Sequence, residues 1–175
     1  MRALRPLVAE FLGTFLLVFA GTAALVADQF PNGKGGPLAT ALAYGLALGI
    51  ATVWTLPYSG GLLNPAITVG FMSTGRLKLV EGLKYIGAQL LGGVAGALVT
   101  RFIWPGNVGR PLSYGTPTII SSVTLGQAIL IEGVLAFVLT SALMGTVVSA
   151  KAPAPKFAGL WMGLTLTLCV LLGGP

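Results

Sequence analysis

Long apolar stretches alternate with short polar connections along most of this chain. About 20 apolar residues are needed for a helix to cross the hydrocarbon core of a bilayer. Five stretches are long enough or nearly so, and with no alternating strand-like pattern they favour helices. They are Leu7–Ala27, Pro37–Leu56, Leu83–Trp104, Leu125–Ser149 and Phe157–Leu172. The pattern therefore predicts an all-α membrane protein with five transmembrane helices.

A sixth element is predicted between the second and third stretches, in the run Ser-Gly-Gly-Leu-Leu-Asn-Pro-Ala-Ile-Thr that begins at Ser59. It is too short to cross a bilayer. Asn64 followed by Pro65 and Ala66 is a strong helix start, because Asn caps a helix and Pro suits its first position. Irregular backbone at membrane depth is tolerated where it is buried in protein or lines a wet cavity. We therefore predict a re-entrant loop with a half-helix that ends near Gly75.

An inverted internal repeat is indicated by the first and fourth stretches. Glu10 and Glu132 are each followed by Phe five positions later. An odd number of spans separates the copies, so they are inverted, and such repeats place a functional site at the membrane midplane. We assign residues 1–104 to the first repeat and 105–175 to a partial second repeat of one domain. The repeat predicts a second half-helix and a sixth span after Pro175, roughly fifty residues. Without them, we expect the chain alone to be no more water-permeable than empty liposomes.

The composition excludes most catalytic chemistry. Of the 175 residues, 55% are hydrophobic and 8% are charged, whereas soluble domains carry roughly 25% charged residues. The chain has no His, one Cys and four acidic residues. Ordinary metal sites and His-based acid–base catalysis are therefore nearly excluded. We predict no catalytic residue, no metal, no cofactor and no enzyme activity. The Gly-x-x-x-Gly pairs that begin at Gly45, Gly92 and Gly159 predict close helix contacts within the bundle.

The net charge of +6 could indicate nucleic acid, but the basic residues lie in short connections between apolar stretches. The positive-inside rule is therefore the better account, and we predict no nucleic-acid partner. Seven basic residues fall on one side of the membrane: Arg2, Arg5, Arg76, Lys78, Lys84, Lys151 and Lys156. Three fall on the other: Lys34, Arg101 and Arg110. This predicts a cytoplasmic N-terminus. We also expect this multi-pass protein to lie in the plasma (inner) membrane.

Three polar side chains at membrane depth have two interpretations each. Glu10 and Glu132 could form a proton relay or accept hydrogen bonds from loop N–H groups. We favour the second role because no His completes a relay. Gln89 could line a pore or support the loop, and we favour support because a buried amide seeks backbone partners.

The chain resembles the aquaporin and glycerol-facilitator family. The resemblance rests on Ala-Glu-Phe-Leu-Gly-Thr-Phe from Ala9, the Asn64-Pro65-Ala66 motif, Tyr-Ile-Gly-Ala-Gln from Tyr85, and the repeated Glu132. It implies an inverted-repeat bundle in which the motif Asn donates an N–H to the passing solute. It also implies a passive channel for water and small neutral solutes such as glycerol, and a homotetramer in the lipid bilayer.

The resemblance also maps two selectivity-filter residues. Tyr44 lies twenty positions before Asn64, and Val170 lies in the fifth stretch, where water-selective members often have His. Val removes a donor and some bulk, which favours a wider filter that passes small polyols. Leu62 is a departure, because many members carry His there. The alternative function is a non-conducting membrane scaffold or oligomer partner. A third possibility, an ion-coupled transporter, would need more buried carboxylates than the sequence offers.

Overall fold

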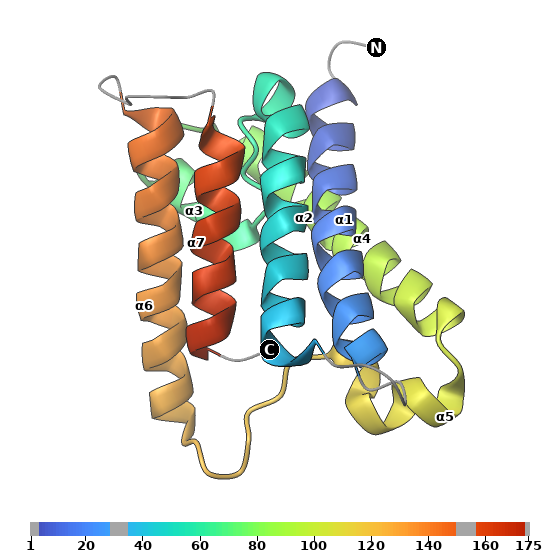
Figure 1. Ribbon diagram of the computed structural model, residues 1–175. Coiled ribbons are helices and arrows are strands. Elements are labelled where there is room, and N and C mark those ends of the chain that lie inside the picture. The colour runs from blue at the N-terminus through green and yellow to red at the C-terminus, as the bar shows by residue number, and fades with distance from the viewer. Residues whose placement is uncertain (1–3, 29–34, 150–156, 174–175) are drawn as a thin grey trace.

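The computed structural model describes residues 4–28, 35–149 and 157–173, and the regular elements in these ranges are all helical (Figure 1). The main helices are α1 (Arg5–Asp28), α2 (Gly36–Ser59), α3 (Pro65–Ser73), α4 (Leu79–Ile103), α5 (Gly106–Gly109), α6 (Leu125–Leu143) and α7 (Ala158–Gly173). A 3₁₀ turn, η2 (Arg110–Gly115), follows α5, and a π turn, η3 (Met144–Val148), extends α6. The prediction of an all-helical membrane bundle is confirmed.

Each predicted apolar stretch contains one long helix. Four helices (α1, α2, α4, and α6 with η3) are long and apolar enough to cross a membrane. The fifth, α7, has 16 residues and so is about 24 Å long, somewhat less than the ~30 Å hydrocarbon core. α4 begins at Leu79, four residues before the predicted start. Glu81 favours this start because its negative charge lies in the first turn, near the positive end of the helix dipole.

Glycines bring α2 and α7 into backbone contact. Gly45 and Gly49 of α2 face Gly159 and Gly163 of α7. A Cβ added at Gly49 would lie 2.8 Å from the carbonyl oxygen of Gly159, and one added at Gly163 would lie 2.7 Å from that of Gly45. Real Cβ atoms do not approach other atoms so closely, so these positions require glycine. The prediction that these pairs form contacts within the bundle is confirmed.

The α1–α4 interface is built in the same way and adds a polar contact. Gly92 and Gly96 lie against the α1 backbone, and a Cβ at Gly96 would come within 2.8 Å of the Phe15 carbonyl oxygen. Nearer the C-terminal ends of α1 and α4, the buried hydroxyls of Thr22 and Thr100 are hydrogen-bonded at 2.7 Å. In the membrane, close backbone packing and interhelical hydrogen bonds replace the hydrophobic effect as the forces that hold helices together.

By contrast, α6 lies at the edge of the bundle (Figure 1). It packs on α7, and most of its large side chains are exposed, with Phe137 at 72%. Such a helix is suited to a lipid environment, where exposed apolar side chains cost nothing.

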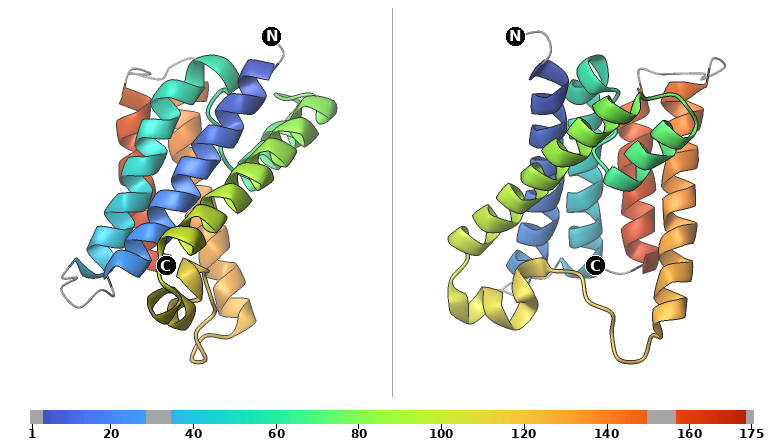
Figure 2. Two further views of the ribbon diagram at one scale, coloured as in Figure 1. Left: turned by 90° about the vertical axis from the view of Figure 1, so that its right-hand side faces the viewer. Right: turned by 180° about the vertical axis from the view of Figure 1, so that it is seen from behind.

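Positive charges separate along the bundle axis. The N-terminal ends of α1 and α4 lie on one side of the molecule, and α5 lies on the other (Figure 2). Arg5, Arg76 and Lys78 are on the first side, and Arg101 and Arg110 lie toward the second. Four of the predicted charges lie outside the described residues: Arg2, Lys34, Lys151 and Lys156.

Candidate functional site

The half-helix α3 begins at the predicted residue. Asn64 has an extended backbone (φ −150°, ψ 124°), and its side-chain oxygen accepts hydrogen bonds from the N–H groups of Ala66 at 2.8 Å and Ile67 at 3.4 Å. Pro65 occupies the first turn, where no N–H is needed. The predicted helix start is confirmed, and α3 ends at Ser73, close to the predicted Gly75.

The segment before Asn64 is tightly folded. Gly60 (φ 85°) and Gly61 (φ 64°) have left-handed backbones, which glycine adopts readily. Leu63 (φ 49°) is also left-handed, which costs a residue with a Cβ about 1–2 kcal/mol. Its side chain is only 2% exposed and lies where a Cβ at Gly13 would be. Packing against α1 therefore helps to hold Leu63 in this conformation.

Glu10 of α1 is the main acceptor for this segment. Its Oε1 accepts from the Leu62 N–H at 3.1 Å, and its Oε2 accepts from the Leu63 N–H at 2.7 Å and from Gln89 Nε2 at 2.7 Å. Glu10 is fully buried and Gln89 is 1% exposed. Hydrogen bonds to an ionised carboxylate are roughly twice as strong as neutral ones. This carboxylate thus ties α1, the loop and α4 together.

Two threonines, which the sequence reasoning missed, extend this network: Thr68 to α3, and Thr14 to the loop before it. Gln89 Nε2 donates to Thr68 Oγ1 at 2.9 Å, and Thr68 Oγ1 donates to the carbonyl oxygen of Asn64 at 2.9 Å. Thr14 Oγ1 donates to the carbonyl oxygen of Leu63 at 3.4 Å. The available signal was the spacing: Thr68 follows Asn64 by four positions, within reach of that carbonyl group on a helix.

A cavity of about 200 Å³ lies beside the tip of α3, between it and the pair α6 and α7. It is lined by Asn64, Glu132, Leu135, Ala136, Leu139, Leu166, Cys169 and Val170. The Asn64 oxygen is occupied in capping, while its Nδ2 group makes no hydrogen bond with any described residue. The cavity therefore combines one available amide donor and the Glu132 carboxylate with apolar side chains of α6 and α7.

Glu132 and Tyr44 are placed differently from the other predicted site residues. Glu132 lines the cavity, is exposed, and accepts no hydrogen bond from any residue that the structure describes. The loop N–H groups that Glu132 was predicted to support are therefore not found among the described residues. Tyr44 does not line the cavity with Val170. Its half-buried ring lies over Gly21 of α1, where the missing side chain leaves room.

No group of three His, Cys, Asp or Glu side chains that could hold a metal occurs among the residues that the structure describes. Cys169 is buried, and its thiol faces the carbonyl oxygen of Leu135 at 3.7 Å.

Comparison with known proteins identifies the family. The family model described as "Major intrinsic protein" matches residues 1–175. Aquaporin TIP4-4 of Zea mays is 35% identical over 98% of this chain, nodulin-26 of Glycine max is 35% identical over 98%, and aquaporin Z of Photorhabdus laumondii is 37% identical over 98%. The chain covers 68%, 61% and 77% of these relatives, respectively.

A solved structure shares the fold. The aquaglyceroporin from Plasmodium falciparum has a TM-score of 0.80 and 24% identity, with 98% of this chain and 72% of that chain covered. The family-model match over residues 1–175, to which the Asn-Pro-Ala half-helix conforms, shows that the chain belongs to the major intrinsic protein family.

Proposed function

We propose that this chain forms the pore wall of a passive transmembrane channel for water and small neutral solutes such as glycerol. The observation that carries the proposal is the Asn64 amide, whose oxygen caps α3 while its N–H₂ group is available at a cavity lined otherwise by Glu132 and by apolar side chains of α6 and α7. The names of the relatives, aquaporins and an aquaglyceroporin, support the same class of solute.

In the proposed mechanism the channel selects solutes by hydrogen bonding and electrostatics and catalyses no reaction. A solute gives up water on entering, and the Asn64 N–H₂ group replaces one of its hydrogen bonds. The N-terminus of α3 adds the positive end of a helix dipole, which disfavours cations without a formal charge. The solute concentration gradient supplies the driving force, and no reaction is catalysed.

The test uses a chimera in which residues 1–175 replace the matching part of the Photorhabdus aquaporin Z. Stopped-flow light scattering of proteoliposomes should show osmotic water flux well above that of empty liposomes, with a lower activation energy than lipid diffusion. Asn64→Ala should reduce this flux, and Asn107→Ala, on the short helix α5, should leave it unchanged. A chimera that inserts and folds but conducts no water or glycerol would refute the proposal.

A non-conducting scaffold or oligomer partner is the second candidate. The observation that favours it is the exposure of α6 and of Glu132, which leaves one side of the cavity without a protein partner among the described residues. The chimera distinguishes the two candidates, because the 175-residue chain alone is expected to be impermeable under either. Water permeability of the inserted and folded chimera at the level of empty liposomes favours the scaffold, and permeability above that level favours the channel.

We predict that Val170→His changes selectivity in the conducting chimera. We propose that Val170, which lines the cavity of Asn64, is a filter residue, whereas Tyr44, whose ring lies over Gly21, is not part of this cavity. The imidazole adds bulk and a donor, so glycerol flux should fall by a larger factor than water flux, as measured side by side in proteoliposomes. Val170→Leu adds bulk without a donor and separates the two effects. Equal losses of both fluxes in Val170→His would show that this residue is not part of a filter.

We also propose a homotetramer in the plasma membrane, with the N-terminus in the cytoplasm. The family supports the tetramer, and the separation of Arg5, Arg76 and Lys78 from Arg110 supports the orientation. Native mass spectrometry of the detergent-solubilised protein measures the assembly, for which we expect four chains.

We predict the outcome of thiol labelling in intact cells for this orientation. In a Cys169→Ser background, Arg110→Cys should react with a membrane-impermeant maleimide, and Arg76→Cys should react only after lysis. The physical reason is that basic connections are retained on the cytoplasmic side during insertion. The reverse pattern would invert the proposed topology.

A further inference from the structure

The cavity of Asn64 ends partway along the bundle, before it reaches the end that holds the N-terminus of α1. Its lining runs from Glu132 to Leu139 on α6 and from Leu166 to Val170 on α7. Because these two helices are antiparallel (Figure 1), Leu139 and Leu166 mark its limit on this side, which is the cytoplasmic side in the proposed orientation. Both side chains are partly buried and pack against a cluster of buried apolar residues. A solute that leaves Asn64 toward the cytoplasm therefore meets this cluster.

The cluster joins the segment before α3 to α2 and to the facing ends of α6 and α7. Its buried members are Leu48, Ala51, Leu62, Leu63, Ile67, Leu143 and Met162. Leu62 precedes α3, Leu143 is the last residue of α6, and Met162 is in the second turn of α7. α3 lies toward the end of the bundle at which α6 ends and α7 begins (Figure 2). The exposed fractions of Leu62, Leu143 and Met162 are 4%, 0% and 2%, so water reaches almost none of their surface.

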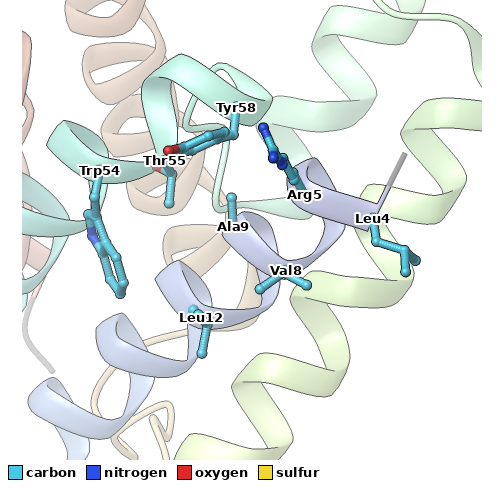
Figure 3. A pocket seen from close by; sticks show the side chains of 8 residues that line it. All are labelled: Leu4, Arg5, Val8, Ala9, Leu12, Trp54, Thr55 and Tyr58. Carbon is cyan, nitrogen blue, oxygen red and sulfur yellow. The ribbon is translucent and has the colours of Figure 1, made fainter. Parts of the chain in front are cut away.

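A second hollow of the molecule does not extend the cavity toward this end. It has a volume of about 650 Å³ and lies on the outside of the bundle between α1 and α2, where Val8, Leu12 and Trp54 are among its lining residues (Figure 3). It shares no lining residue with the cavity of Asn64. The cluster around Leu62 therefore separates the cavity from the cytoplasmic end of the space between α3 and the pair α6 and α7.

We propose that Leu62, together with Leu143 and Met162, forms a dry apolar barrier that limits the rate at which solutes pass between Asn64 and the cytoplasm. The inference rests on the proposed function, because it takes the cavity of Asn64 as part of a solute path. A polar solute that enters an apolar passage gives up hydrogen bonds to water and finds no replacement there. Hydrophobic constrictions limit conduction in channels because they exclude water. Leu62 is therefore a residue that determines the rate of conduction without binding the solute.

The side chain of Leu62 can be changed while the hydrogen bonds of the half-helix stay in place. Its N–H group donates to Glu10 Oε1 at 3.1 Å, and this bond does not involve the side chain. The cap of α3 uses the Asn64 oxygen and the N–H groups of Ala66 and Ile67. Core side chains change rotamer from time to time, so the barrier opens transiently and slows conduction without abolishing it.

Core packing alone predicts a different result from the same substitution. Leu62→Ala leaves a cavity in a buried cluster and costs stability. If packing were the only role of Leu62, water flux would fall or stay the same as the half-helix loosens. A barrier predicts a rise in flux, because the truncation leaves room for water, whose share of liquid volume is roughly 30 Å³ per molecule. The sign of the change in flux therefore separates the two roles.

The first measurement is osmotic water flux through the chimera with aquaporin Z, expressed per reconstituted protein. An apolar barrier that falls by the transfer free energy of one methylene group changes a rate by roughly fourfold, so Leu62→Ala should raise the flux by roughly fourfold or more. Leu143→Ala should raise it as well, and the double variant should gain less than the product of the two factors. Val26→Ala, a truncation of a fully buried side chain outside the cluster, should leave the flux unchanged.

The second measurement does not depend on conduction, because it detects water next to Met162 in the 175-residue chain itself. Pulsed X-ray radiolysis turns water into hydroxyl radicals, and a Met side chain that they reach becomes the sulfoxide, which mass spectrometry detects. Met162 should be protected, whereas the partly exposed Met72 and Met144 should be oxidised. Leu62→Ala should raise the oxidation of Met162 relative to Met72, and Val26→Ala should not.

Two results would overturn the barrier while the proposed function stands. One is a conducting chimera in which Leu62→Ala lowers the water flux or leaves it unchanged. The other is oxidation of Met162 in the unaltered chain to the same extent as Met72, which would show that the cluster is wet. If Leu62→Ala does not fold, Leu143→Ala decides by the same two measurements. A chimera that conducts neither water nor glycerol, with or without Leu62→Ala, refutes the proposed function and with it any control of the rate by Leu62.

Discussion

Glu10→Ala should destabilise the protein more than any other single side-chain truncation in the half-helix network, by roughly 3 kcal/mol or more. The Leu62 N–H, the Leu63 N–H and the Gln89 amide would all lose their acceptor in a buried place. Each unsatisfied buried donor costs about 1–3 kcal/mol. The free energy of unfolding can be measured by titrating the detergent-solubilised protein with sodium dodecyl sulfate. The buried Cys169 thiol, the one cysteine of the chain, serves as the reporter because it reacts when the bundle opens.

Two further variants should lose less stability than Glu10→Ala and provide a comparison for it. Glu10→Gln keeps the volume and one acceptor oxygen but places an N–H₂ group against donors, so we expect a smaller loss of roughly 1–2 kcal/mol. Thr14→Val removes a long hydrogen bond to the same loop while preserving shape, and should cost less than about 1 kcal/mol. Stability of Glu10→Ala within about 1 kcal/mol of the wild type would mean that water or another side chain replaces the carboxylate.

Gly163→Ala should destabilise the α2–α7 contact by about 1–3 kcal/mol, and Gly163→Leu should separate these helices. The added Cβ would lie 2.7 Å from the Gly45 carbonyl oxygen, so the backbones must move apart. Moving them also loosens Gly49 against Gly159. The same unfolding titration measures the loss, and we expect α7 to become accessible to proteases before α1 does.

Gly133→Ala is the matched control and should increase the free energy of unfolding, whereas Gly163→Ala should decrease it. Gly133 is also a helix-interior glycine, but on the exposed α6, where an added Cβ has no atom within 4 Å. Alanine there should stabilise the helix by up to about 1 kcal/mol, through helix propensity alone. If both alanine variants shift stability in the same direction, close packing is not what Gly163 provides.

Local chemistry explains what could be predicted from the sequence. The start of α3 follows from two adjacent residues, Asn64 and Pro65, whose preferences act within one turn. The glycine pairs likewise mark close helix contacts wherever they occur in a membrane bundle, although the sequence does not say which helices they join. Gly49 and Gly159 were each recognisable as members of such pairs, but the sequence did not show that they face one another.

Features that depend on contacts between distant segments could not be predicted from the sequence. The left-handed Leu63 is held by Glu10, which lies 53 residues away, and no local signal marks it. The short helix α5 and the turn η2 lie in a connection where η2 packs against α1, and a Cβ at Gly115 would lie 2.9 Å from Thr22. The position of the Tyr44 ring over Gly21 depends on how α1 and α2 pack, which the spacing to Asn64 does not encode.

The Glu10 network also has a consequence for biosynthesis: Glu10 is made well before the residues that hydrogen-bond to it. Leu62, Leu63 and Gln89 follow Glu10 by 52, 53 and 79 residues. At 5–20 residues per second, a ribosome needs roughly 4–16 s to go from Glu10 to Gln89. Throughout this interval the nascent α1 carries a carboxyl group with no partner in its second turn, and an unpaired carboxyl group opposes insertion of this part of the helix into the hydrocarbon core. We therefore expect α1 to reach its final depth late, when α4 has been made and the half-helix can dock.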